Sequence, residues 1–379
     1  MTLTALSPAE VARSLAEPTL TVGVEEEFLL LDPHSWHNAP LAAAARAALP
    51  ADLRERSRVE FRSSMLEMVS PVCTRLRQLQ GTLRQNRSAA GAAAESVGAR
   101  LVAVGATPVG EPDLEVVDTP RFHAIARHYG PIAHDPALCG FHVHVGVPDR
   151  ELAIQVCNAI RPWLPALQAL TANSPFSAGA DTGHASWRGI ALERWPSLGP
   201  APYLHSSADY ERVVGELVAA GVMLDASMVL WWARPSSRYP TVEIRVADVV
   251  PTAAETVVVA GLARALVATA IADIAADREP LVPPEHLLRA AHWNAARAGL
   301  GGTLLDLRTR APRPAWDLVD DLVATVGGAL DRHGDRPDVE AGLAHLREHG
   351  TGADRQRRAA AERGLPGALA ALAEATVSG

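Results

Sequence analysis

Hydrophobic and polar positions alternate in a short stretch near the start of the chain, TLTVGVEEEFLLL at residues 19–31. Side chains of a β-strand point alternately to its two faces, so this pattern predicts a strand with its valines, Phe28 and Leu30 on one face. Glu25 and Glu27 then share the other face, about 7 Å apart along the strand. Two carboxylates at this spacing suit neighbouring hard cations. The acids inside this apolar strand therefore indicate a bound cation.

The middle carboxylate of the run, Glu26, is predicted to point to the apolar face. An isolated buried carboxylate is destabilising by several kcal/mol, or it loses its charge. We therefore expect a partner for Glu26, most simply an arginine.

Two later segments, GFHVHVGV and TVEIRV, alternate in the same way. The first places His142 and His144 on one face, and the second places Glu243 and Arg245 there. A segment at 59–69, VEFRSSMLEMV, adds Glu67 among apolar residues. If the apolar faces of these strands pack on helices, the opposite faces form one common surface of acids, histidines and an arginine.

Such a site suits Mg²⁺ or Mn²⁺ better than zinc, because zinc prefers His and Cys ligands in a tetrahedron. An arginine beside the metals indicates a polyphosphate substrate, with Arg245 stabilising the transferring phosphoryl group. Each pattern alone has a simpler interpretation: a histidine pair within a sheet, a surface ion pair worth under about 1 kcal/mol, or a solvated acidic face. Their coincidence favours a metal site.

Helices and strands of uneven length follow one another without the regular βαβ order of a parallel sheet. Capping boxes at 7–10 and 252–255 predict two helices, the second of which runs to about residue 276. Further helices are expected over 75–98, over 150–171 with breaks at Pro162 and Pro165, and from 315 onward. A strand is expected over 100–106, and loops are expected over 173–202 and 349–357. The length of the loop at 173–202 suggests a function. We expect an α+β fold with an antiparallel sheet, in a single domain over residues 1–379.

Composition excludes several classes of protein. The net charge of −8 argues against a nucleic-acid partner, which needs a basic surface. All 35 basic residues are arginine, so a Walker P-loop, a pyridoxal-phosphate enzyme and a protein kinase are excluded, because each needs a lysine. Arginine and metal must therefore hold any phosphate.

The three cysteines do not suggest a disulfide framework, and the first residues lack the pattern of a secretory signal. The apolar stretch 256–274 contains Arg264 and Asp273 and is expected to be a buried helix rather than a membrane span. We therefore expect a cytoplasmic protein without a membrane partner. Its oligomeric state is left open, with a homodimer as one option.

The chain carries, in this order, the motifs GVEEEF, SSMLEMVSPVC, CGFHVHVGVPDRE, TANSPF, DTGHASWR, TVEIRVADVVPT, NAARAGL and GTGADRQR. With these motifs it resembles the carboxylate-amine ligases of glutamate-cysteine ligase type 2, over nearly its whole length. The resemblance implies a fold related to glutamine synthetase, in which a curved antiparallel sheet flanked by helices holds Mg-ATP on its concave face.

The resemblance also implies roles for individual residues. The metal ligands it implies are Glu25, Glu27, Glu67, His144 and Glu243. Arg245 is expected to contact phosphate and, with Glu27, to serve catalysis. Weaker candidates for contacts to substrate or nucleotide are Asn294 and Arg297 in NAARAGL, Arg188 in DTGHASWR and Arg355 in GTGADRQR.

The implied reaction begins when a substrate carboxylate attacks the γ-phosphate of ATP, and an amine then displaces phosphate from the acyl phosphate to leave an amide. Nothing in the sequence specifies which small-molecule carboxylate and amine are the substrates. Glutamate and cysteine are one possibility, and aromatic or other substrates are another. We expect selectivity to reside in the loop at 173–202, with Trp187 and Trp195.

Three alternatives use the same residues differently. A metallohydrolase would use the histidine pair to bind metal and activate water, without ATP. A non-catalytic sensor would bind nucleotide or metal on the same scaffold. A thiol nucleophile at Cys139 is disfavoured, because acidic surroundings do not lower a thiol pKa.

Overall fold

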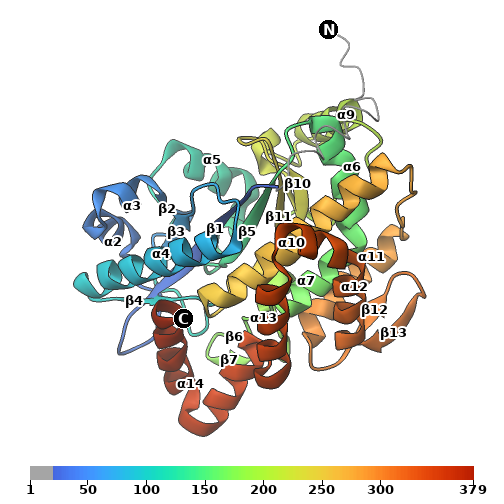
Figure 1. Ribbon diagram of the computed structural model, residues 1–379. Coiled ribbons are helices and arrows are strands. Elements are labelled where there is room, and N and C mark those ends of the chain that lie inside the picture. The colour runs from blue at the N-terminus through green and yellow to red at the C-terminus, as the bar shows by residue number, and fades with distance from the viewer. Residues whose placement is uncertain (1–19) are drawn as a thin grey trace.

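Seven strands form an antiparallel sheet at the centre of the molecule (Figure 1). The computed structural model describes residues 20–379, so the helix expected from the capping box at 7–10 lies outside the described residues. The strand order is β10-β11-β5-β1-β3-β2, and β4 also pairs with β1. The strands are β1 (Val22–Leu31), β2 (Ser57–Val59), β3 (Met65–Val69), β4 (Arg100–Val102), β5 (Gly140–Gly146), β10 (Ala233–Pro235) and β11 (Thr241–Asp248).

Helices surround this sheet, and three short strand pairs lie outside it. The helices are α2 (Ala42–Ala48), α3 (Ala51–Glu55), α4 (Leu76–Ser96), α5 (Pro120–Tyr129), α6 (Arg150–Ile160), α7 (Leu164–Leu170), α8 (Trp187–Leu192), α9 (Ser207–Ala219), α10 (Ala253–Ala275), α11 (Glu285–Ala298), α12 (Ala315–His333), α13 (Arg336–His349) and α14 (Gly352–Ser378), with 3₁₀ turns η1 (Gly130–His134), η2 (Arg161–Trp163) and η3 (Ala226–Met228). The short pairs are β6 (Phe176–Ser177) with β7 (Ala180–Asp181), β8 (Leu198–Gly199) with β9 (Leu230–Trp231), and β12 (Thr303–Asp306) with β13 (Ala311–Pro314). The predicted α+β class with an antiparallel sheet is confirmed.

Helix α10 is the centre of the main hydrophobic core. It packs on β1 and β5 and on helices α4, α6, α12 and α13, and its residues join apolar side chains of β1, β5, β10 and β11 in one buried cluster. By length and composition α10 could cross a membrane, but 78% of its most apolar window is buried inside the protein. Arg264 in this helix is buried and forms an ion pair of 2.6 Å with Asp335. The prediction of a buried helix is therefore confirmed.

Local sequence signals explain where several helices begin and end. The Thr252 side chain accepts a hydrogen bond from the backbone N–H of Glu255 and so caps α10. The predicted helix over 75–98 is confirmed as α4, and the prolines at 162 and 165 divide the next predicted helix into α6, η2 and α7.

Three predicted segments were wrong in part. The loop expected over 173–202 contains the short strands β6, β7 and β8 and the helix α8. β4 ends at Val102 rather than at residue 106, because the chain turns there and the Gly105 N–H donates to the carbonyl of Asn173 instead of to a strand. The segment 349–357 is not one loop, since α14 begins at Gly352. Thr351 and Asp354 form a reciprocal capping box at this point.

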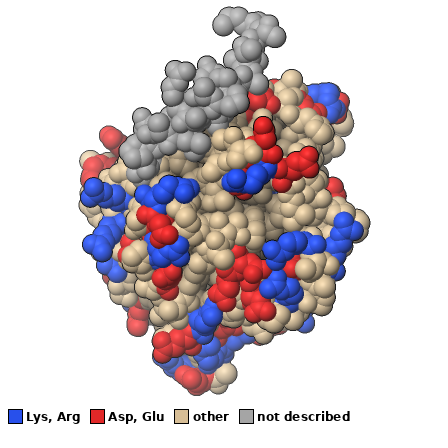
Figure 2. Space-filling view, turned by 45° about the vertical axis from the view of Figure 1, so that its right-hand side comes forward, with Lys and Arg blue, Asp and Glu red and all other residues tan. Residues whose placement is uncertain are grey.

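Charges of both signs are spread over the face of the molecule in Figure 2. Arginines and acids lie there in small mixed patches, separated by wide areas of other residues.

Candidate active site

Strand register brings the predicted polar residues onto one face of the sheet. Glu25 of β1 lies opposite His142 of β5, and His144 lies opposite Glu243 of β11. On the other side of β1, Glu27 lies opposite Glu67 of β3. Residues that face one another across an antiparallel pair share a face. The prediction that separate strands deliver these side chains to one surface is therefore confirmed. We call the set Glu25, Glu27, Glu67, His142, His144, Glu243 and Arg245 the polar strip.

The opposite face of β1 carries the predicted arginine partner of Glu26. Arg87 of α4 holds Glu26 with two hydrogen bonds, of 2.6 and 3.1 Å, and both side chains are fully buried. Arg87 also donates to the carbonyls of Val250 and Pro251, and Thr256 donates to Glu26. The expectation of an arginine partner is thus confirmed, and this pair ties β1 to α4 and α10.

Glu25 and the two histidines form the centre of the polar strip. Glu25 lies 3.4 Å from His142 Nδ1 and 3.6 Å from His144 Nε2. Burial, together with the charge of Arg245, lowers the pKa of His142. Neutral imidazole is the form that can accept a hydrogen bond or bind a metal.

His144 places its Nε2 3.6 Å from Glu25, just beyond hydrogen-bond distance. Its Nδ1 lies 3.0 Å from the hydroxyl of Thr241, whereas its buried Nε2 has no hydrogen-bond partner within residues 20–379. When one ring nitrogen is held by such an outer partner, the tautomer and orientation of the other are fixed. Nε2 is thereby left free to bind a metal ion.

On the β1–β3 side of the polar strip, the carboxylates outnumber the positively charged side chains. Burial and the charges of Glu27 and Glu25 raise the pKa of Glu60 to about 7. Burial and the charge of Glu60 raise the pKa of Glu67 well above its usual range. Like charges directly opposite in a sheet are destabilising, so a cation at this position would relieve the repulsion.

Arginines balance the opposite end of the polar strip. Arg234 of β10 grips Glu243 with two hydrogen bonds, of 3.0 and 3.2 Å, and Arg245 forms a second ion pair with the same carboxylate. Burial alone would raise the pKa of Glu243, but the charges of Arg245 and Arg234 outweigh it and hold the pKa well below its usual range. Arg245 Nη1 also lies 3.4 Å from His142 Nδ1. The arginines thus favour the ionised form of Glu243, and this carboxylate and the Arg245 guanidinium lie side by side.

Arg188 reaches the polar strip from helix α8. A side chain on Gly140 would meet the guanidinium of Arg188 at 2.3 Å, and Gly140 points to the same face as His142. Arg188 donates to the backbone carbonyls of Arg245 and Val246, and its buried Nε has no hydrogen-bond partner within residues 20–379. Of the weaker arginine candidates, Arg188 is the one that the structure brings to the polar strip.

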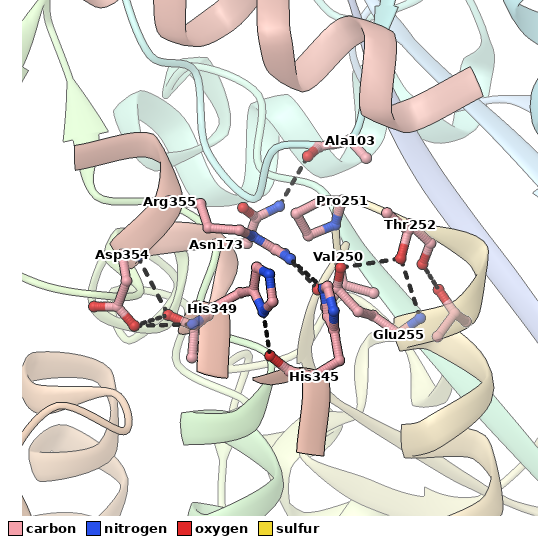
Figure 3. A network of polar contacts seen from close by, with 12 residues as sticks. Ala103, Asn173, Val250, Pro251, Thr252, Glu255, His345, His349, Asp354 and Arg355 are labelled. Atoms are coloured by element: carbon pink, nitrogen blue, oxygen red, sulfur yellow. Dashed lines mark hydrogen bonds and ion pairs between the residues drawn. The ribbon is translucent and has the colours of Figure 1, made fainter. Parts of the chain in front are cut away.

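The other weaker candidates are engaged elsewhere. Asn294 accepts the backbone N–H of Leu305 at 2.8 Å, and Arg297 donates to the carbonyl of Gly183. Arg355 forms an ion pair of 2.7 Å with Glu255, and Figure 3 shows this pair beside His345. The structure does not bring these three side chains to the polar strip, and their role in binding nucleotide or substrate stays a prediction.

Two residues of the site were missed in the sequence. Glu60 lies in the same segment as Glu67, but it falls between β2 and β3, where no alternation marks its direction. Arg234 lies opposite Glu243 in the register of β10 and β11, and the short β10 gave no periodic signal. The one signal in the sequence that could have identified Glu60 was an acidic residue two positions before Arg62 and seven before Glu67.

The candidate selectivity residues occupy different surroundings. Trp195 packs in an aromatic cluster with Phe61 and Tyr129, at 6.3 and 5.0 Å between ring centroids. Trp187 lies edge-on to His184. Trp195 is therefore part of a small core at the end of the loop, and its role in selectivity stays a prediction.

The thiol of Cys139 is buried next to this site. Burial and the charge of Glu27 raise its pKa well above the usual value, and a thiol is a poor nucleophile in its protonated form. The three cysteines are free and buried. These surroundings support the expectation that Cys139 is not a nucleophile.

The donor set fits a hard divalent cation whose coordination is completed by substrate. Within residues 20–379, no three His, Cys, Asp or Glu side chains are gathered closely enough to form a ready-made metal site. Mg²⁺ usually binds through one or two carboxylates together with substrate phosphates and waters, rather than in an all-protein cage. The free Nε2 of His144 and the crowded carboxylates of the polar strip fit such a site.

Comparisons with known proteins agree with this picture. The model of the Glutamate-cysteine ligase family 2 (GCS2) matches residues 21–372. A Salinispora arenicola protein named "Putative glutamate--cysteine ligase 2" is 60% identical over 341 residues, which make up 90% of this chain and 90% of that protein. A Nocardia farcinica protein named "Putative glutamate--cysteine ligase 2-1" is 45% identical over 361 residues, covering 95% of this chain and 94% of its own.

Solved structures share the fold. The crystal structure of glutamate–cysteine ligase from Francisella tularensis in complex with AMP has a TM-score of 0.71 at 12% identity, and the match covers 95% of this chain and 89% of that one. A bifunctional glutathione synthetase from Pasteurella multocida has a TM-score of 0.69 at 15% identity, covering 96% of this chain and 53% of that one.

Proposed function

The chain belongs to glutamate-cysteine ligase family 2 and is an ATP-dependent carbon–nitrogen ligase, and we propose that it joins a small carboxylate to an amine through an acyl phosphate. The observation that carries this proposal is the polar strip. Four neighbouring strands bring carboxylates, imidazoles and an arginine to one face of the sheet, with His144 Nε2 left free.

Phosphoryl transfer needs positioning and neutralisation of charge more than covalent chemistry by the protein. In the first step, an oxygen of the substrate carboxylate attacks the γ-phosphorus of ATP, and the bond from that phosphorus to the leaving oxygen of ADP breaks. Arg245 lies beside Glu243, which holds its guanidinium in place for the transferring group. A planar guanidinium offers two parallel donors to phosphate oxygens and keeps its charge at any working pH.

In the second step, the amine nitrogen attacks the acyl carbon, loses a proton, and displaces phosphate to leave the amide. The guanidinium of Arg188 lies against Gly140 on the face of the sheet that carries the polar strip, and its buried Nε has no partner within residues 20–379. We propose that it binds an oxygen of the carboxylate substrate or of the phosphate, because a buried donor without a partner is unfavourable.

Mg²⁺ or Mn²⁺ would be held by Glu25, Glu27, Glu67, His144 and Glu243, with phosphate oxygens completing the coordination. The cation would neutralise the triphosphate while it transfers its γ-phosphoryl group. Thr241 fixes the ring of His144, and the backbone N–H of Gly140 donates to Glu27 at 2.6 Å. Both contacts orient proposed ligands before any metal arrives.

The names of the relatives make glutamate and cysteine the first substrates to test. We place the reaction in the cytoplasm, where ATP is available and the three free cysteines stay reduced.

The decisive experiment incubates the purified protein with Mg-ATP and pooled carboxylates and amines, and follows ADP together with new amide masses. ADP release that needs both co-substrates, with one new amide mass, is the expected result. Hydroxylamine in place of the amine should trap the activated carboxylate as a hydroxamate. Cleavage without ATP would favour a metallohydrolase, and ATP binding without turnover of any pool would favour a sensor.

A further inference from the structure

Strand β11 contains one extra residue relative to β5. The register between these strands shifts from Ile244 to Ala247, and such a β-bulge reverses the alternation of faces that follows it. Asp248 therefore lies opposite Gly140 and shares its face, which carries the polar strip. Without the bulge, the period of two that directs Arg245 to this face would turn Asp248 to the other one.

The carboxylate of Asp248 is buried and holds three hydrogen-bond donors. Asp248 is 1% exposed. Its Oδ2 accepts from the Ser174 hydroxyl at 2.7 Å and from the backbone N–H of Asn173 at 3.0 Å. Its Oδ1 accepts from the Ser186 hydroxyl at 2.8 Å. Burial raises the pKa of Asp248, and the charge of Arg188 and these hydrogen bonds oppose that rise.

Both serines also bind the backbone of helix α8. Ser174 Oγ accepts from the N–H of Arg188 at 3.0 Å, and Ser186 Oγ caps the helix by accepting from the N–H of Gly189 at 3.1 Å. A hydroxyl group has a single hydrogen, so donation to a carboxylate fixes its direction and leaves its lone pairs for the helix. Asp248 therefore sets the position of the first turn of α8, which carries Arg188.

The guanidinium of Arg188 lies on the same bulge. It donates to the carbonyls of Val246 and Arg245 at 3.4 and 3.3 Å, and its Nη1 lies 4.0 Å from Asp248 Oδ1. Any side chain on Gly140 would collide with this guanidinium. The backbone of Arg188 and its charged end are thus both held by groups at the end of β11.

This arrangement fixes a cation beside the proposed reaction. Burial lowers the pKa of Arg188, and the charges of Asp248 and Glu27 oppose that change. The influence of Glu27 places the guanidinium near the carboxylates of the polar strip. A planar cation held in advance at one position stabilises an anionic oxygen without having to reorganise.

We infer that Asp248 is a positioning residue of the ligase, which acts through the two serines to hold Arg188 in place for an anionic oxygen of the substrate. This inference rests on the proposed binding role of Arg188. It requires that Asp248 contributes to turnover only through Arg188. A residue that merely stabilised the fold would affect turnover whether or not Arg188 were present.

A double-mutant cycle tests this requirement. Asp248→Asn keeps the shape of the side chain but removes its charge, and it should lower the rate of ADP release with Mg-ATP and the pooled carboxylates and amines at least about tenfold. Arg188→Met should lower the rate at least as much. The double variant should match Arg188→Met, because no guanidinium is left to position. If the two effects multiply instead, Asp248 acts independently of Arg188 and the inference is wrong.

A milder variant repeats the cycle without touching the buried carboxylate. Ser186→Ala removes one of the two links between Asp248 and α8. It should slow ADP release in the wild-type background and have no further effect in Arg188→Met. A further loss in the Arg188→Met background would count against the inference in the same way.

Amide hydrogen exchange separates this inference from the proposed function. Peptides that cover α8 should exchange roughly tenfold faster in Asp248→Asn, because the serine hydroxyls lose their fixed direction. Asp306→Asn, a buried aspartate that pairs with Arg313 away from the sheet, is the matched control and should change neither this exchange nor ADP release. Unchanged exchange of α8 in Asp248→Asn would overturn the inference whether or not the wild type releases ADP. A wild type that releases no ADP with any pool would instead refute the proposed function.

Discussion

Glu26 and Arg87 form a fully buried ion pair on the side of β1 that faces the helices, directly behind the carboxylates of the polar strip. The same three-residue run thus supplies two acids to the proposed chemistry and one to the core. Arg87, which lies on α4, also donates hydrogen bonds to Pro251 and Thr256 and so connects β1 and α4 with the start of α10. The position of the reactive face therefore depends on a contact on the opposite face.

Arg87→Met should destabilise the fold strongly. It leaves Glu26 buried without its charge partner, and breaking a buried pair in this way typically lowers the free energy of unfolding by about 3–5 kcal/mol. Urea unfolding followed by circular dichroism measures the change. The double variant Glu26→Gln with Arg87→Met should regain part of the loss, because no uncompensated charge remains. A loss below about 1 kcal/mol in the single variant would contradict this role.

Glu27→Gln should lower turnover strongly and leave the fold intact. The amide keeps an oxygen for the Gly140 N–H, but it removes the charge that would hold a metal ion, so we expect a fall in kcat on the order of 10²–10³. ADP release under the conditions found for the wild type measures it. Glu95→Gln, on the surface and paired with Arg100, is the matched control. A near-normal rate for Glu27→Gln would remove Glu27 from the list of ligands.

Arg245→Lys should impair the enzyme although it preserves the charge. A lysine cannot offer the two parallel donors of guanidinium, and the loss of one charge-assisted hydrogen bond, worth about 1.5–3 kcal/mol, lowers kcat roughly tenfold or more. Arg313→Lys, whose arginine pairs with Asp306 and Asp321 away from the sheet, should leave kcat unchanged. If the kcat of Arg245→Lys is within a few-fold of the wild-type value, Arg245 does not bind the transferring phosphoryl group with two parallel N–H donors.

Residues on regular strands were predictable, because alternation fixes the direction of each side chain. The period of two placed Glu25, Glu27, His144 and Glu243 on one face, and the register of β1, β5 and β11 agrees. The need for a cationic partner of Glu26 followed from the energy of a buried charge. The sequence did not show which arginine is the partner of Glu26, because Arg87 lies on a helix 61 residues away along the chain.

Residues outside regular strands escaped prediction for a physical reason. Glu60 reaches the polar strip from the turn between β2 and β3, and Arg188 reaches it from the short helix α8, so no strand period fixes the direction of either side chain. Arg188 was named through the resemblance alone, and Glu60 was not named at all. The start of α14 was missed although Thr351 and Asp354 have capping-box spacing, because the glycines around them suggested a loop.

Glu60→Gln should change how stability depends on pH. The folded-state pKa of Glu60 is about 7, above the ordinary value of 4.5, so the folded protein holds an extra proton between these values. The contribution of Glu60 to the free energy of unfolding therefore falls as pH rises through about 4.5 to 7. Glutamine does not titrate in this range.

Urea unfolding in EDTA at pH 5 and at pH 8 tests this prediction. The stability of the wild type relative to Glu60→Gln should decline from pH 5 to pH 8, whereas Glu95→Gln should track the wild type at both. A constant difference between wild type and Glu60→Gln would show that the pKa of Glu60 is not raised. Added Mg²⁺ should reduce the decline, because a cation favours the ionised carboxylates.

Thr241→Val should raise the Mg²⁺ concentration needed for activity. The variant keeps the shape of the side chain but removes the hydroxyl that holds His144 Nδ1 at 3.0 Å, so the ring loses its fixed tautomer and orientation. Loss of such an outer contact typically reduces metal affinity or activity about 10–100-fold. Titration of ADP release with Mg²⁺ at saturating ATP separates a shift in half-saturation from a fall in kcat. Thr303→Val, on the exposed edge of β12, is the matched control, and an unshifted Mg²⁺ curve for Thr241→Val would mean that His144 does not bind the metal.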